Sequence, residues 1–104
     1  MVFYVAHCYG GKPENLIKAR ERVRRLQIRD PDNTYLCPLF ALAFLEYGEL
    51  GRDVEMELCY DLLSICDALI VASDESDGVD KEITMAERMN MEVIYLARDK
   101  SLRL

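Results

Sequence analysis

The sequence predicts a single α/β domain built on a doubly wound parallel sheet of four or five strands. Short apolar runs of strand length alternate with longer segments of helical pattern. One run, residues 68–72, is apolar throughout and too short for a free-standing helix, which is typical of a strand buried on both faces. No repeat, low-complexity segment or linker interrupts the chain, so residues 1–104 are expected to form one domain.

Composition limits the classes of function. An apolar share of 51% indicates a compact globule. A net charge of -6 and a pI near 4.7 argue against binding to a nucleic-acid polymer, which needs a basic surface. A small anionic ligand stays possible, because helix N-termini bind anions without net positive charge. No apolar run approaches the ~20 residues of a membrane span, and residues 1–7 resemble a strand more than a signal peptide.

The four cysteines and the single histidine do not form a metal-binding pattern. Cys8, Cys37, Cys59 and Cys66 include no C-x-x-C pair. Without an export signal, we expect a cytoplasmic protein whose thiols are reduced and mostly buried. Neither a metal nor a cofactor is predicted.

The first strand is predicted at Val2–Ala6, followed by a glycine-containing loop, residues 7–13. Pro13 and Glu14 suit the first turn of a helix. The apolar face of that helix is predicted to be Leu16, Ile17, Val23 and Leu26. The opposite face is strongly basic, which fits either a solvated surface or a phosphate-binding patch.

The middle of the chain is predicted to contain a short strand and two helices. The strand is residues 34–37, ended by Pro38. Residues 39–47, LFALAFLEY, are expected to be helical and are apolar nearly all round, so they are either deeply buried or part of a subunit interface. We therefore expect a homodimer or higher homo-oligomer. Asp53 is predicted to cap the next helix, whose core side chains are Met56, Leu58, Leu62, Leu63 and Ile65.

The last third repeats the strand and helix alternation. The central strand, residues 68–72, leads into a polar turn at residues 73–78 and a helix at residues 79–90. Residues 92–96 are a fourth strand, and residues 97–104 are a short edge element or a partner contact. The order implies right-handed crossovers with helices on both faces of the sheet.

If the strands lie in the order 2-1-3-4, as in flavodoxin-like folds, the loops after the first and third strands meet at the topological switch point, where such sheets bind ligands. The first loop is neither G-x-G-x-x-G nor G-x-x-x-x-G-K-[ST]. A dinucleotide fold or a P-loop nucleotidase is therefore poorly supported.

The second of these loops carries the candidate catalytic residues. Ser76 and Gly78 open the helix, and Glu82 lies about one turn into it, where it can point back over the strand end. A structural alternative is that Ser76 or Asp77 caps the helix, Gly78 eases the turn and Glu82 favours the helix dipole.

The chain resembles the nucleoside 2-deoxyribosyltransferase superfamily, including its deoxynucleoside monophosphate N-glycosidase branch and small bacterial and phage relatives. The resemblance covers most of the chain. It is carried by FYVAHCYGGKPEN near the start, by MELCYDLLSICDALIV, and by the S-x-G-x-x-x-E motif of Ser76, Gly78 and Glu82. It implies that the serine and glycine hold a phosphate and that Glu82 is the nucleophile. It also implies that His7, Tyr9 and Gly10 contact the substrate. For His7 the alternative is a structural histidine that is hydrogen-bonded to the backbone.

The sequence departs from the glycosidase branch at three positions. That branch has a serine at His7, an arginine at Tyr9 and an aspartate at Cys59. Lys12 is predicted to supply the missing positive charge, and Asp61 or Glu57 the missing carboxylate. The expected function is therefore an N-glycosidase or deoxyribosyltransferase acting on a nucleoside or its 5′-monophosphate. The alternatives are a catalytically silent nucleotide-binding or regulatory domain and a pure interaction domain.

Overall fold

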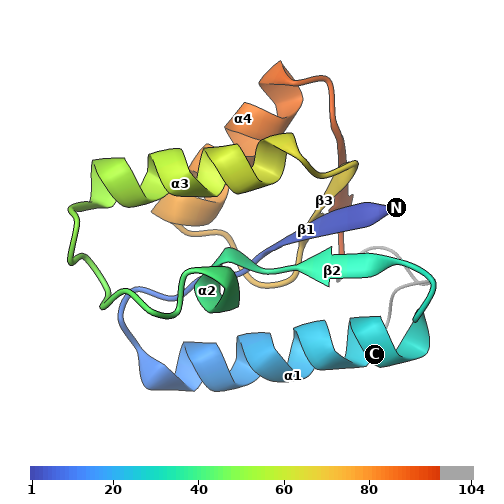
Figure 1. Ribbon diagram of the computed structural model, residues 1–104, viewed down its shortest axis with the longest axis horizontal. Helices are drawn as coiled ribbons and strands as arrows, with labels where there is room; N and C mark the ends of the chain where they lie inside the picture. The colour runs from blue at the N-terminus through green and yellow to red at the C-terminus, as the bar shows by residue number, and fades with distance from the viewer. Residues whose placement is uncertain (97–104) are drawn as a thin grey trace.

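In the computed structural model, which describes residues 1–96, the strands form one fully parallel sheet. The strand order β2-β1-β3-β4 is the predicted one (Figure 1). The strands are β1 (Val2–Ala6), β2 (Thr34–Leu36), β3 (Ala68–Val71) and β4 (Glu92–Tyr95). β1 has the predicted bounds, and each of the others ends one residue earlier than predicted. The α/β class and flavodoxin-like topology are therefore confirmed, while the predictions for residues 97–104 lie outside the described residues.

Helices cover both faces of the sheet (Figure 1). α1 (Pro13–Arg29) lies on one face, and α3 (Arg52–Ser64) and α4 (Asp77–Arg88) lie on the other. α2 (Pro38–Ala41) is a single turn after β2. Because successive strand residues point to opposite faces, each strand contributes to two cores. The core under α3 and α4 includes Tyr4, Ala6, Leu63, Leu69, Val79 and Ile83. The core over α1 includes Val5, Leu26, Tyr35, Ile70 and Ala72.

α1 begins where the sequence predicts, but one face residue was assigned wrongly. Pro13 occupies the first turn, Glu14 follows it, and Arg29 lies in the last turn. Ala19 and Leu26 are buried, whereas Ile17 is 71% exposed. The side of α1 that faces the sheet is formed by Leu16, Ala19, Val23 and Leu26, which are three, four and three residues apart. Ile17 lies about 100° around the helix from Leu16 and points away from this side.

The predicted helix at residues 39–47 is wrong beyond Ala41. The chain continues in tight turns, with i to i−3 hydrogen bonds from Ala43 to Phe40 and from Leu45 to Leu42. A three-residue repeat lets Leu39, Leu42 and Leu45 line one small apolar cavity of about 80 Å³. Such a repeat fits 3₁₀-type turns better than an α-helix of 3.6 residues per turn. Phe44 is left 79% exposed.

α3 begins at Arg52 without the predicted Asp53 cap. Its N-cap is Gly51, at φ 86°, and no side chain caps it. The buried carboxylate of Glu55 instead accepts hydrogen bonds from the backbone N–H groups of Gly48 and Leu50, at 3.2 and 3.3 Å. Further along, Met56 and Leu63 are buried as predicted, but Ile65 is exposed because the helix ends at Ser64. Glu55 therefore organises the turn that precedes the helix.

No helix within residues 1–96 is long and apolar enough to cross a membrane. All four cysteines are free thiols. Cys37 and Cys66 are buried, and Cys8 and Cys59 are half-buried. In the same part of the chain, no group of three or more His, Cys, Asp or Glu side chains is placed to hold a metal ion.

Candidate active site

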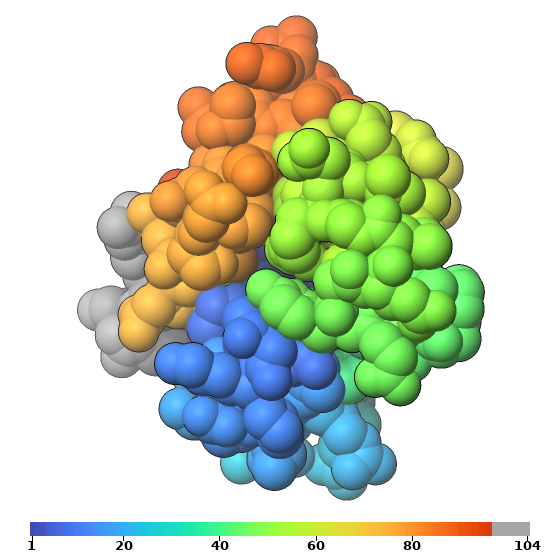
Figure 2. Space-filling model, turned by 90° about the vertical axis from the view of Figure 1, so that its left-hand side faces the viewer, coloured from blue at the N-terminus to red at the C-terminus, as the bar shows by residue number. Residues whose placement is uncertain are grey.

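A cavity of about 320 Å³ opens at the carboxyl edge of the sheet, on the α3 and α4 side of β1. Figure 2 looks onto this edge and shows a hollow between the first loop in blue, the region of α3 in green and the start of α4 in orange. Residues from all three segments line the cavity: His7, Tyr9, Gly10, Pro38, Leu39, Tyr47, Arg52, Met56, Cys59, Ser76, Asp77, Gly78, Val79 and Glu82. This edge is where open α/β sheets bind ligands.

Glu82 lies in the cavity wall, in the second turn of α4. It is only 5% exposed, and the hydroxyl of Tyr4 donates a hydrogen bond to its Oε2 atom. Tyr4 is fully buried in β1. Sequence reasoning missed this tyrosine, although a buried Tyr hydroxyl within an apolar strand needs a polar partner. The bond fixes the carboxylate against the middle of the sheet.

Burial sets the protonation of Glu82. It raises the pKa of the carboxyl group from 4.5 to about 7, although the Tyr4 hydrogen bond and the Arg52 charge each lower it. The pKa of Tyr4 is raised well above 10, first by burial and then by the charge of Glu82. Tyr4 therefore stays protonated and keeps donating, while Glu82 exists in both ionisation states near neutral pH.

Ser76 and Gly78 lie beside Glu82 in the cavity wall. Ser76 is the N-cap of α4, and its Oγ atom accepts from the Val79 N–H at 3.3 Å. The helix begins at Asp77, two residues earlier than predicted. A Cβ atom at Gly78 would meet only Arg52 Nη2, at an ordinary 3.5 Å. Ser76 thus fills the structural role weighed for it and also borders the cavity.

His7 lies in the cavity wall, but both of its ring nitrogens already have partners. Nδ1 lies 2.8 Å from the Cys8 carbonyl oxygen, and Nε2 lies 2.8 Å from Arg22 Nη1. Since the carbonyl must accept and the guanidinium must donate, this pattern assigns a neutral ring protonated on Nδ1. Burial, first, and the charges of Arg22 and Lys18 lower the pKa of His7, against the hydrogen bond to Cys8. The geometry matches the structural alternative for this histidine.

Aromatic side chains and one arginine form the outer part of the cavity. Tyr9 meets Tyr47 edge to face, with ring centroids 5.1 Å apart. Arg52 stacks over the Tyr47 ring at 5.0 Å and pairs with Glu55 at 3.1 Å. Gly10 has a positive φ of 62°, which a side chain disfavours. Arg52 and Tyr47 were missed by sequence reasoning because the turns at residues 42–51 bring them to the cavity.

The structure does not bring Lys12 or Asp61 to the cavity. Lys12 is the exposed N-cap of α1, and Asp61 is exposed on α3. Glu57 is also exposed. Cys59 lines the cavity itself, and burial raises the pKa of its thiol to about 11. Residues 59 and 61 lie roughly 200° apart around a helix. Met56, Cys59 and Leu63 are three and four residues apart, which is the spacing of one face of a helix. The sequence therefore already indicated that Cys59 lies on the buried face of α3.

Comparison with known sequences adds no family to this geometry. No protein-family model matches the chain, and a search of curated proteins finds no match.

Proposed function

We propose that the protein is an N-glycosidase or deoxyribosyltransferase that cleaves the base–sugar bond of a nucleoside or its 5′-monophosphate, with Glu82 as the nucleophile. One observation carries the proposal. A buried carboxylate, oriented by Tyr4, lies in a cavity at the switch point of a doubly wound sheet. A carboxylate with a strongly raised pKa in a cavity is typical of functional sites. The resemblance of Ser76, Gly78 and Glu82 to the glycosidase motif supports the same assignment.

The reaction would proceed in two steps. The ionised Glu82 oxygen attacks the anomeric carbon while the bond from that carbon to the base nitrogen breaks. The base leaves with the bonding electrons and takes a proton from solvent, which gives a glycosyl ester on Glu82. Water, or the nitrogen of another base, then attacks the same carbon. This releases the Glu82 carboxylate, and the attacking group's proton passes to solvent.

The remaining cavity residues are suited to hold the substrate. The N-terminus of α4 presents backbone N–H groups beside Ser76 and Gly78, and Arg52 adds a positive charge that a 5′-phosphate can use. Asp77 also borders the cavity, but Lys81 pairs with its carboxylate at 3.1 Å. Tyr9 and Tyr47 provide aromatic surface for a planar base.

The test is release of free base. The protein is incubated with a panel of ribo- and deoxyribonucleosides and their 5′-monophosphates, and the products are separated by chromatography. Wild type is expected to release base from at least one member, and Glu82→Gln is expected to lower that rate by several powers of ten. Glu87→Gln, an exposed change on the same helix, is the matched control. Equal rates for Glu82→Gln and wild type would remove Glu82 as the nucleophile.

The second candidate is a catalytically silent nucleotide-binding domain. One argument for it is Cys59, a thiol that stays protonated where the glycosidase branch has a carboxylate. The other is the hydrogen bond that Glu82 already accepts from Tyr4. This candidate predicts that calorimetry detects saturable binding of a panel member while no base is released. Binding and chemistry therefore separate the two functions in one set of samples.

A further inference from the structure

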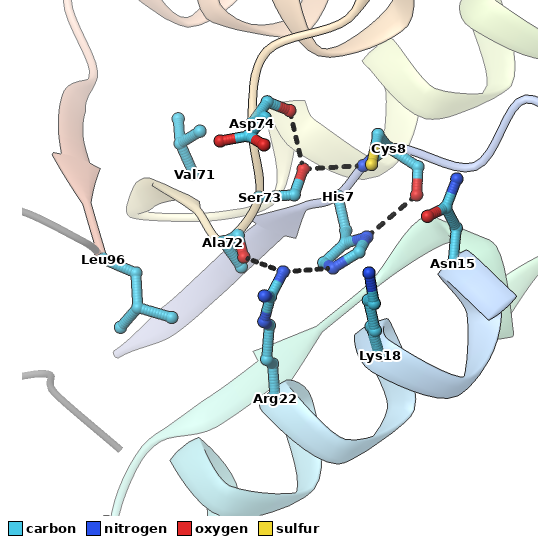
Figure 3. Close-up of a pocket in the computed structure, with 10 residues that line it drawn as sticks. All are labelled: His7, Cys8, Asn15, Lys18, Arg22, Val71, Ala72, Ser73, Asp74 and Leu96. Carbon is cyan, nitrogen blue, oxygen red and sulfur yellow. Dashed lines mark hydrogen bonds between the residues drawn. The ribbon is translucent and has the colours of Figure 1, made fainter.

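A second and larger cavity lies on the opposite side of β1, between α1 and the end of β3. Its volume is about 420 Å³, within the range of small-molecule sites. Figure 3 shows its lining: His7, Cys8, Asn15, Lys18, Arg22, Val71, Ala72, Ser73, Asp74 and Leu96. Among the lining residues of the two cavities, His7 is the shared one. The proposed glycosidase chemistry uses no residue of this second cavity.

Two cations from successive turns of α1 extend toward the His7 ring (Figure 3). Arg22 is half-buried and is held in place because its Nη1 atom donates to the Ala72 carbonyl and to His7 Nε2, each at 2.8 Å. Both bonds use Nη1, so the Nε and Nη2 groups stay available to a ligand. Lys18 has no hydrogen bond or ion pair within residues 1–96. One cation is thus preorganised, and the other has no partner among the described residues.

The described residues of the lining carry a net charge close to +1. Lys18 and Arg22 are positive, Asp74 is negative, and His7 is neutral in its assigned tautomer. Ser73 is already committed, since its Oγ atom accepts from the Cys8 N–H at 2.8 Å and donates to the Asp74 carbonyl at 2.9 Å. A single negative charge on the ligand would neutralise the site, whereas a dianion would leave an excess of negative charge beside Asp74.

The end of the cavity near the sheet is apolar. Ala72 and Leu96 line it, and both belong to the core over α1. The side chain of Val71 belongs instead to the core under α3 and α4. In Figure 3 Leu96 lies away from Lys18 and Asn15, so the polar and apolar parts of the lining are separate. A ligand that fills such a space has a charged head and an apolar body.

From this arrangement we propose that the α1 cavity binds a small organic monocarboxylate. Its carboxylate pairs with Lys18 and with the free N–H groups of Arg22, and its apolar body packs against Leu96 and Ala72. Arg22 is suited to this role, because a guanidinium matches a planar carboxylate in geometry.

Titration of the ¹⁵N-labelled protein, followed by NMR, tests the proposal with benzoate, benzamide and inorganic phosphate as probes. Benzoate is expected to bind saturably and to shift the amide signals of Lys18, Ala72 and Ser73. Benzamide has nearly the same shape without the charge and is expected to bind at least tenfold more weakly, as is phosphate, which lacks an apolar body.

Paired variants locate the site. Lys18→Gln is expected to weaken benzoate binding about fivefold or more, whereas Arg20→Gln, which removes the same charge from an exposed position two residues along α1, leaves it unchanged. Lys18 is exposed, so its replacement is not expected to disturb folding. The proposal is overturned if benzoate does not bind below about 20 mM, if benzamide or phosphate binds as tightly, or if the two variants behave alike.

Discussion

The hydroxyl of Tyr4 donates a hydrogen bond to the carboxylate of Glu82 in α4. Tyr4 lies in β1, one of the two central strands of the sheet. Both side chains are at most 5% exposed. This contact joins the middle of β1 to the helix that follows β3. It orients the acid in the cavity and influences how tightly that acid holds its proton. The first prediction concerns this pair.

Replacement of Tyr4 by Phe should raise the pKa of Glu82 above about 7, because the hydrogen bond that favours the ionised form is lost. The variant should also be less stable by about 1–3 kcal/mol, the cost of leaving a buried acceptor without its donor. Carboxyl ¹³C signals followed against pH measure the first effect, and urea unfolding measures the second. Tyr35→Phe, which removes a 2.7 Å bond to Asp30, should leave the pKa of Glu82 unchanged.

Replacement of Glu82 by Gln should stabilise the protein in a pH-dependent manner. The folded protein holds this proton more tightly than the unfolded chain, with a pKa of about 7 against 4.5. The favourable contribution of the protonated group is therefore complete below pH 4.5 and is lost as the pH rises through 7. Glutamine avoids this loss, so the variant should gain on the order of 3 kcal/mol at pH 8 and little at pH 4.5. Urea unfolding at both pH values checks this, and Glu87→Gln should show no such difference.

If Glu82 is the nucleophile, kcat/KM for base release should rise about tenfold per pH unit up to about pH 7 and then level off. Only the ionised carboxylate attacks, and kcat/KM reports the pKa of the free enzyme. A profile that falls above pH 7 would instead indicate that Glu82 donates a proton. Rates measured from pH 5 to 9 at constant ionic strength decide between the two.

Replacement of Arg52 by Gln should weaken the binding of a 5′-monophosphate about tenfold more than it weakens the binding of the matching nucleoside. The reason is that the phosphate carries the negative charge that pairs with the guanidinium, and the nucleoside has none. Calorimetric titration of both ligands measures the difference. The control is Lys12→Gln, since Lys12 does not line the cavity. If Lys12→Gln has the larger effect, the cation predicted from the sequence holds the phosphate after all.

The exposed aromatic surface at residues 40–50 predicts self-association. Phe44 is 79% exposed, and Phe40, Tyr47 and Leu50 are exposed near it in the chain. Light scattering at micromolar concentration is expected to give at least the mass of a dimer. Phe44→Glu should reduce that mass to the monomer's. A monomeric wild type would remove the prediction.

Much of the architecture was predictable from local pattern. Strands, connecting loops and the position of Ser76, Gly78 and Glu82 at the start of a helix follow from short apolar runs and turn residues. Right-handed crossovers then restrict the strand order. That Glu82 and His7 share a cavity wall follows from the same rules, because parallel strands end at one edge of the sheet.

Tertiary structure decided which side chains complete the site. The sequence predicted a helix at residues 39–47 where the chain forms turns beyond Ala41. It therefore did not reveal that residues 42–51 bring Tyr47 and Arg52 to the cavity while Lys12 stays outside. Tyr4 and Glu82 are separated by 78 residues and meet only when α4 packs against the sheet. The pKa of about 7 at Glu82 has the same origin, because burial is a property of the packed fold and of no local segment.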